Sequence, residues 1–130
     1  MNVIVRVDSS LEIGTGHVMR CLSIAEGLQE NGVNVEFICR KFKGNLIDKI
    51  QSRGFKVFVL NAHRKNIHDH KLSHSHWLGA SQQDDAQESI EILKYIQPEW
   101  LIVDHYGIDK DWQQELKAYY KKLIFRNPWA

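Results

Sequence analysis

A glycine-rich turn that carries a histidine is the part of this sequence best suited to chemistry. The segment Gly14-Thr15-Gly16-His17 follows a short apolar run and precedes apolar residues at helical spacing. Between a strand and a helix, such a turn places backbone N–H groups and the positive end of the helix dipole at the sheet edge where open α/β folds bind ligands. Histidine is the side chain best suited to proton transfer near pH 7. The motif alone also fits an ordinary connection with a solvent-exposed histidine.

Composition excludes several classes of protein. The chain has 130 residues, enough for one domain, with 43% hydrophobic and 25% charged residues. A net charge of +1 gives no electrostatic basis for binding nucleic acid or a membrane surface. No apolar run reaches the roughly 20 residues of a membrane-spanning helix, and no signal peptide is recognisable. Cys21 and Cys39 are expected to pack as small apolar residues. We therefore expect a cytoplasmic protein.

The elements that must position the turn alternate between strands and helices. Apolar runs predict strands over residues 3–8, 33–39, 55–60 and 100–104, and from residue 123. Helical spacing predicts helices between them, one ending at Asn31-Gly32, one starting at a cap on Ser81, and one capped by Asp109. Five strands separated by helices imply a Rossmann-like parallel sheet with flanking helices, the first strand being central.

The turn is a poor match to a dinucleotide-binding site. The third glycine of that fingerprint would fall at Met19, and the second strand ends in Cys39-Arg40 where an acidic residue would hold a ribose. We therefore expect no nicotinamide or flavin cofactor. Residues 61–79 are polar without a clear period, and we expect a long surface loop there. Its histidines match no structural zinc spacing, so no metal site is expected; these histidines are His63, His68, His70, His74 and His76.

Read in order, several short motifs resemble one family. They are Arg6-Val7-Asp8-Ser9-Ser10, Ile13 to Arg20, Trp77-Leu78-Gly79 with Asp84-Asp85-Ala86, and Val103 to Asp109 with Trp112 beyond. This order resembles the amino-terminal half of the UDP-2,4-diacetamido-2,4,6-trideoxy-β-L-altropyranose hydrolases of pseudaminic acid biosynthesis, from Asn2 to about Ile124. The resemblance implies the amino-terminal half of a GT-B type fold. It also implies that residues 1–130 are the sugar-side domain, and that the nucleotide-binding domain lies outside this chain, in cis or in trans.

The resemblance also implies a reaction. Water attacks the anomeric carbon of a UDP-linked amino sugar, and UDP leaves by C–O cleavage with inversion, without a metal or cofactor. His17 corresponds to the proposed general base. The chain alone is expected to be inactive. Two alternatives stay open: a non-catalytic module that binds a sugar or a partner, and a glycosyltransferase of GT-B type.

Further candidate site residues surround His17 in this interpretation. Amides of Gly14 and Gly16 would help to neutralise the leaving group. Asp8 would orient His17 or bind a sugar hydroxyl, or else cap the turn, and Arg20 lies one helical turn beyond His17. Asp104, His105 and Tyr106 end a later strand at the same edge, where they can converge on His17 to bind the sugar. Arg6 is expected to face the other way, as a buried ion-pair partner.

Overall fold

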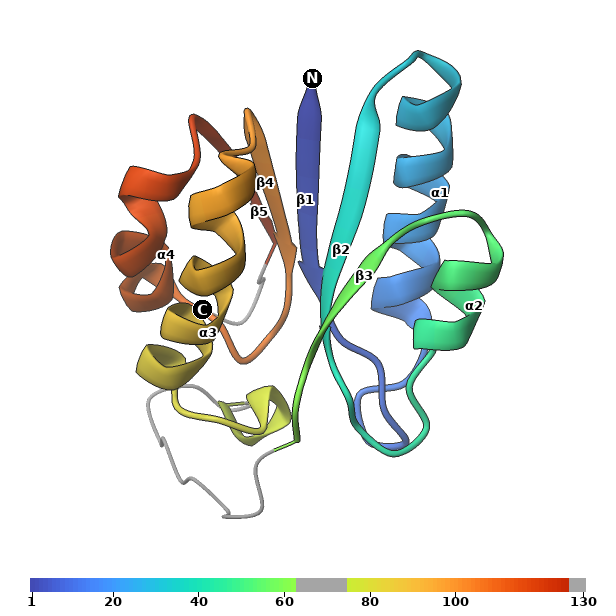
Figure 1. Cartoon of the computed structure of the whole chain (residues 1–130). Coiled ribbons are helices and arrows are strands. Elements are labelled where there is room, and N and C mark those ends of the chain that lie inside the picture. Colours follow the sequence, from blue (N-terminus) through green and yellow to red (C-terminus); the bar gives the residue numbers. More distant parts are fainter. Residues whose placement is uncertain (63–74, 127–130) are drawn as a thin grey trace.

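A five-stranded parallel sheet forms the centre of the molecule in the computed structural model, which describes residues 1–62 and 75–126 (Figure 1). The strands are β1, Asn2–Val7; β2, Asn34–Arg40; β3, Val57–Leu60; β4, Trp100–Asp104; and β5, Lys122–Arg126. They lie in the order β3-β2-β1-β4-β5, and all neighbouring pairs are parallel. The predicted Rossmann-like α/β fold is confirmed, with the first strand in the middle.

Helices cover both faces of this sheet. They are α1, Gly16–Glu30; α2, Ile47–Ser52; α3, Gln82–Ile96; and α4, Lys110–Leu116, with short 3-10 helices η1, Ser75–Leu78, and η2, Lys117–Tyr119. Figure 1 shows α1 and α2 on one side of the sheet and α3 and α4 on the other. Among the described residues, no helix is long and apolar enough to cross a membrane.

Side chains of β1 alternate between two hydrophobic cores. One core lies between the sheet and α1, and from β1 it contains Val3, Val5 and Val7. Ile4 packs on the opposite face, in a core shared with α3 and α4. Because successive residues of a strand point to opposite faces, odd positions of β1 face α1, and even positions such as Arg6 face α3.

The ends of the helices follow the predicted signals. The Ser81 hydroxyl accepts the Asp84 N–H at 3.0 Å at the start of α3. The Asp109 carboxylate accepts the Asp111 N–H at 2.8 Å before α4. After α1, Gly32 takes a φ of 79°, a conformation that glycine adopts without strain.

The prediction of a long surface loop over residues 61–79 is partly wrong. Residues 63–74, including the histidines from His63 to His74, lie outside the described residues. Ser75–Leu78 instead forms η1, and Leu78 is buried in the core with α3. A single leucine among polar residues has no periodicity that reveals its burial, because the apolar surface that covers it comes from distant segments.

Candidate functional site

The candidate site lies where β1 and β4 end and α1 begins, at the carboxyl edge of the sheet. The connection from β1 to α1 is tightened by the Gly14 N–H, which donates to the Ser10 carbonyl at 2.9 Å. Gly14 has a φ of 83°, so a glycine is needed there. This turn brings His17 into the first turn of α1, beside the end of β4.

His17 is held by the last residue of β4. Its Nδ1 lies 2.7 Å from Oδ1 of Asp104. Since an ionised carboxylate only accepts hydrogen bonds, Nδ1 must carry the proton, and the neutral ring then has Nε2 as its acceptor. Nε2 accepts no hydrogen bond from residues 1–62 or 77–126, the part of the chain whose side chains the structure describes. The His17 side chain is mostly buried, with 10% of its surface exposed.

Arg20 fixes Asp104 from the other side. Its Nε donates to Oδ2 and its Nη2 to Oδ1, each at 2.8 Å, in a two-pronged ion pair. Burial acts to raise the pKa of Asp104, but hydrogen bonds from His17 and Arg20 outweigh it and hold that pKa below its usual value. Asp104 is therefore ionised at neutral pH and keeps His17 in one orientation.

Cys21 lies next to this cluster but is poorly suited to act as a nucleophile. Its Sγ is 3.8 Å from Oδ2 of Asp104. Burial, followed by the negative charge of Asp104, raises the pKa of the Cys21 thiol to about 12. The reactive thiolate is thus scarce at neutral pH. Cys21 and Cys39 are both free and buried, as the sequence predicted.

Two aromatic rings extend the site away from His17. The Tyr106 ring meets the His17 ring edge-on, with centroids 4.6 Å apart. Trp77 of η1 stacks on Tyr106 at 5.9 Å. Tyr106 is among the site residues predicted from the sequence, whereas Trp77 was recognised only as part of a motif. The motif Trp77-Leu78-Gly79 could have indicated that Trp77 belongs to the site. Its stacking on Tyr106 could not be predicted, because the two residues are distant in the sequence.

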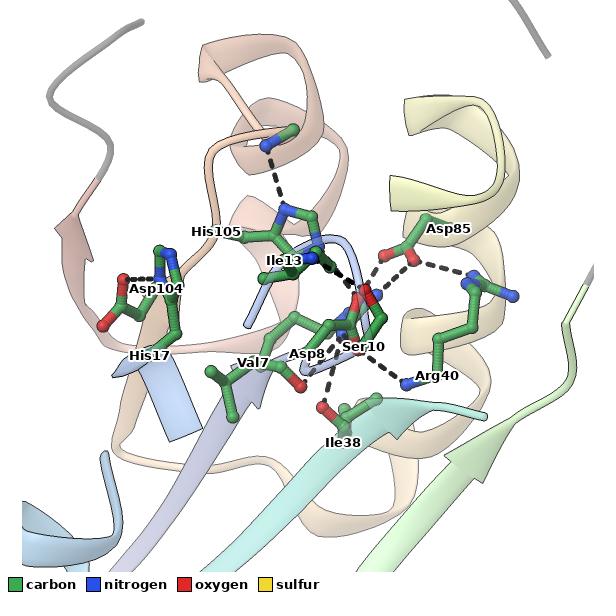
Figure 2. A network of polar contacts seen from close by, with 12 residues as sticks. Val7, Asp8, Ser10, Ile13, His17, Ile38, Arg40, Asp85, Asp104 and His105 are labelled. Atoms are coloured by element: carbon green, nitrogen blue, oxygen red, sulfur yellow. Dashed lines mark hydrogen bonds and ion pairs between the residues drawn. The ribbon is translucent and has the colours of Figure 1, made fainter. Parts of the chain in front are cut away.

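Asp8 is not the partner of His17. Its Oδ1 accepts Nη1 of Arg6 at 2.6 Å and the Arg40 N–H at 2.7 Å, and its side chain is fully buried. Burial works to raise its pKa, but Arg6 and His105 lower it far below the usual value. Figure 2 shows Asp8 within a network that is separate from the His17–Asp104 pair. Of the roles considered for Asp8, orienting His17 therefore belongs to Asp104, and Asp8 instead braces the end of β1 against β2.

His105 belongs to the same network and does not converge on His17, contrary to the sequence prediction. The Gly107 N–H donates to its Nδ1 at 2.9 Å, so Nε2 carries the proton and donates to Oδ2 of Asp8 at 2.9 Å (Figure 2). His105 thereby ties the segment that carries Tyr106 to the end of β1. Its contribution to the site is indirect.

Asp85 connects the sheet to α3 through buried charges. It accepts Nη2 of Arg6 at 2.6 Å, Nη2 of Arg40 at 2.7 Å and the indole N–H of Trp112 at 2.8 Å. Burial opposes ionisation, but the two guanidinium groups lower the pKa of Asp85. The prediction that Arg6 is a buried ion-pair partner is confirmed. From the sequence, Asp85 was recognised only as part of a motif. Its position in the sequence does not indicate which distant residues it contacts.

The amides of the two predicted glycines lie in different places, that of Gly14 inside the turn and that of Gly16 in the first turn of α1. The Gly14 amide is bound to Ser10 within the turn and cannot also bind an anion. Gly16 starts α1, whose cap residue Thr15 makes no side-chain capping hydrogen bond. The first amides of a helix have no partner within the helix, so they suit a negatively charged group.

Taken together, these features define a Rossmann-like α/β domain with an oriented histidine at the carboxyl edge of its sheet. No protein-family model matches the chain. It is 30% identical over 125 residues to an uncharacterized protein of Methanocaldococcus jannaschii, covering 96% of this chain and 21% of that protein. It is also 31% identical over 117 residues to the UDP-2,4-diacetamido-2,4,6-trideoxy-beta-L-altropyranose hydrolase of Campylobacter jejuni, covering 90% of this chain and 32% of that protein. The chain thus spans about a fifth to a third of these relatives, and its similarity to the named hydrolase is distant.

Proposed function

We propose that this chain is the sugar-side domain of a nucleotide-sugar hydrolase that removes UDP from a UDP-linked diacetamido-trideoxy sugar, in pseudaminic acid biosynthesis. The observation that carries the proposal is the 2.7 Å contact between Nδ1 of His17 and Asp104, which leaves Nε2 available as a base. The relative named as such a hydrolase supports the choice of substrate. A cytoplasmic location belongs to the same proposal.

In the proposed reaction, His17 acts on water. Nε2 takes a proton from the water while the water oxygen bonds to the anomeric carbon. The bond from that carbon to the phosphate oxygen breaks, and UDP leaves with the electron pair, so the configuration inverts. Asp104, kept ionised by Arg20, balances the positive charge that forms on the imidazole. Amides at the start of α1 would stabilise part of the charge on the diphosphate.

The proposal assigns the nucleotide to a second domain. Because the chain covers 32% of the hydrolase that it resembles, the complete activity is assigned to a larger GT-B type assembly, with the nucleotide-binding domain in cis or in trans. This chain would supply His17, the residues that orient it and the surface that receives the sugar.

Replacing His17 tests the proposal in a protein that combines this chain with a nucleotide-binding domain. His17→Gln should lower kcat by about a hundred- to ten-thousandfold, the usual contribution of a positioned general base. Affinity for UDP should stay unchanged, since the nucleotide contacts the other domain. Ser23→Ala, an exposed change on the same helix, is the matched control.

Three other outcomes would contradict this assignment. Near-normal turnover by His17→Gln would remove His17 as the base. Sugar binding without any turnover in the unmodified protein would indicate a non-catalytic binding module. Transfer of the sugar to an acceptor other than water would indicate a glycosyltransferase.

A further inference from the structure

The last residue of β5, Arg126, lies next to the His17–Asp104 pair, and no role was predicted for it from the sequence. Where β5 pairs with β4, Arg126 is the partner of Asp104 across the two strands. The His105 N–H donates to the Arg126 carbonyl at 3.4 Å and extends this pairing to the end of the strand. Since neighbouring strands lie about 4.8 Å apart, Arg126 is adjacent to Asp104 at the carboxyl edge of the sheet.

The side chain of Arg126 leaves the sheet on the α1 face. On β5, Phe125 packs on the other face, against the core with α3 and α4. Lys122 lies on the α1 face, where its Nζ is 5.4 Å from the centre of the Trp100 ring, and Trp100 packs against the core with α1. Because side chains alternate along a strand, Arg126 shares the face of Lys122. This is also the face that carries the candidate site.

The positive charge of Arg126 is not balanced within the described part of the chain. Its side chain is exposed and makes no hydrogen bond or ion pair with residues 1–62 or 77–126. Asp104, its partner across the strands, is already occupied. Oδ1 of Asp104 accepts from His17 and Arg20, and Oδ2 accepts from Arg20. The site therefore holds two guanidinium groups against one carboxylate, with the excess positive charge at the exposed end of β5.

A guanidinium group in this position suits an oxyanion. Arginine stays protonated in proteins, and its planar fork of N–H donors matches two oxygens of a phosphate group. The backbone of Arg126 is fixed in the sheet, whereas its side chain is exposed. An oxyanion bound by Arg126 would thus be held next to His17.

We propose that Arg126 binds the phosphate group that leaves the anomeric carbon when His17 activates water. This inference rests on the proposed function, because it takes that reaction as given. As the C–O bond breaks, its electron pair stays on the phosphate oxygen, and N–H groups of Arg126 donate to the phosphate as its charge increases. The guanidinium keeps its proton throughout, so His17 remains the proton acceptor. Only the phosphate next to the sugar contacts Arg126, and the rest of the nucleotide belongs to the second domain.

Titration of the 130-residue chain with pyrophosphate, followed by NMR at about 0.15 M salt, tests this contact without any turnover. The Nε–H signal of Arg126 and the ring signals of His17 should shift as pyrophosphate binds. Arg126→Gln should weaken pyrophosphate binding by about fivefold, the upper range for an ion pair exposed to solvent. Arg126→Lys should recover part of the affinity, because lysine keeps the charge but loses the two-pronged geometry.

Lys122→Gln is the matched control. It removes the same charge from the same face of β5, at a distance of about 13 Å along the strand. That distance exceeds the screening length of about 8 Å at this salt concentration. Pyrophosphate binding should therefore be unchanged in Lys122→Gln.

Kinetics in the assembled enzyme test the role of Arg126 in the reaction. Arg126→Gln should lower kcat more than it raises KM, because the charge on the phosphate increases in the transition state. A raised KM with unchanged kcat would overturn the assignment of Arg126 to the leaving phosphate.

The binding experiment has equally clear contrary results. No binding of pyrophosphate, unchanged affinity in Arg126→Gln, or an equal loss in Lys122→Gln would each overturn the assignment of Arg126 and leave the test on His17 untouched. Conversely, if His17→Gln retained turnover while Arg126→Gln lost pyrophosphate binding, the hydrolase mechanism would fail and the phosphate contact would stand.

Discussion

Asp104 and Asp8 end neighbouring strands, yet only Asp104 reaches His17. The difference follows from the alternation of side chains along each strand. Asp8 shares the even positions of Arg6, which point away from α1, whereas Asp104 lies on the face of Ile102, which packs with α1. This parity is readable in the sequence, and applying it to both carboxylates would have predicted the correct partner of His17.

Replacing Asp104 tests how His17 is oriented. In Asp104→Asn the amide can turn its NH₂ group toward Nδ1, which would move the ring proton to Nε2 and remove the base. Turnover in the assembled enzyme should then fall on the order of 10⁴-fold, as when the equivalent charge is lost from a Ser-His-Asp triad. Nitrogen-15 NMR on the chain should show the ring proton on Nδ1 in the unmodified protein and on Nε2 in the variant.

Asp48→Asn provides the matched control, because Asp48 is an exposed carboxylate on α2. It should change neither turnover nor the position of the ring proton. An Asp104→Asn protein with normal turnover and its proton still on Nδ1 would show that the carboxylate charge is unimportant for His17.

At the scale of helices and strands, periodicity predicted the order of elements, but not the polar contacts between them. Alternating and helical patterns located the five strands and the four α-helices but missed η1, and the strand ends are shifted by one or two residues, as at Phe55, which precedes β3. The partners of Asp85 could not be predicted, because Arg6, Arg40 and Trp112 are distant in sequence. Burial of Leu78 could not be predicted either, because the residues that cover it come from distant segments.

Asp85 should be the main polar anchor of α3. Asp85→Asn keeps the shape of the side chain but leaves Arg6 and Arg40 with less opposing charge in a buried place. We expect the free energy of unfolding to fall by about 3–5 kcal/mol, as when one partner of a buried ion pair is removed. Asp84→Asn, an exposed change in the same helical turn, should cost less than about 1 kcal/mol. Urea denaturation of both variants measures the difference.

The free energy of unfolding should also depend on pH through the carboxylate of Asp85. The pKa of Asp85 is lower in the folded chain than in the unfolded chain, where aspartate titrates near about 3.9. The unfolded state therefore takes up this proton first as the pH falls. The stabilisation from Asp85 is complete above about pH 5 and is lost as the pH falls toward the folded pKa. Asp85→Asn should lose stability less steeply below about pH 5, and parallel curves for the two proteins would contradict this explanation.

Considered as a whole molecule, the chain has a different kind of polar cluster on each face of its sheet. The α1 face carries the His17–Asp104 pair near solvent, whereas the α3 face carries charges that are fully buried. In the proposed assembly the first cluster meets the sugar, and the second keeps the sheet edge rigid. The nucleotide should find few partners on this chain.

Isothermal titration calorimetry with UDP tests that distribution. The 130-residue chain should bind UDP weakly and should hydrolyse the UDP-sugar hardly at all, because the proposal places the nucleotide contacts in the other domain. Addition of a nucleotide-binding domain should raise the affinity. Tight binding of UDP to this chain alone would mean that the roles of the two domains are assigned wrongly.

The consecutive residues Asp104 and His105 point to opposite faces, and this bears on how β4 finds its register beside β1. In the native pairing Val7 lies opposite Asp104. A slip of one residue would exchange the faces of the whole strand. Asp104 would then join Asp8 and Asp85 among the buried charges, and Arg20 would lose its carboxylate. Because Arg6 and Arg40 already balance Asp8 and Asp85, Asp104 would be buried there without a partner. The free-energy cost of that unpaired charge helps to exclude the misaligned sheet during folding.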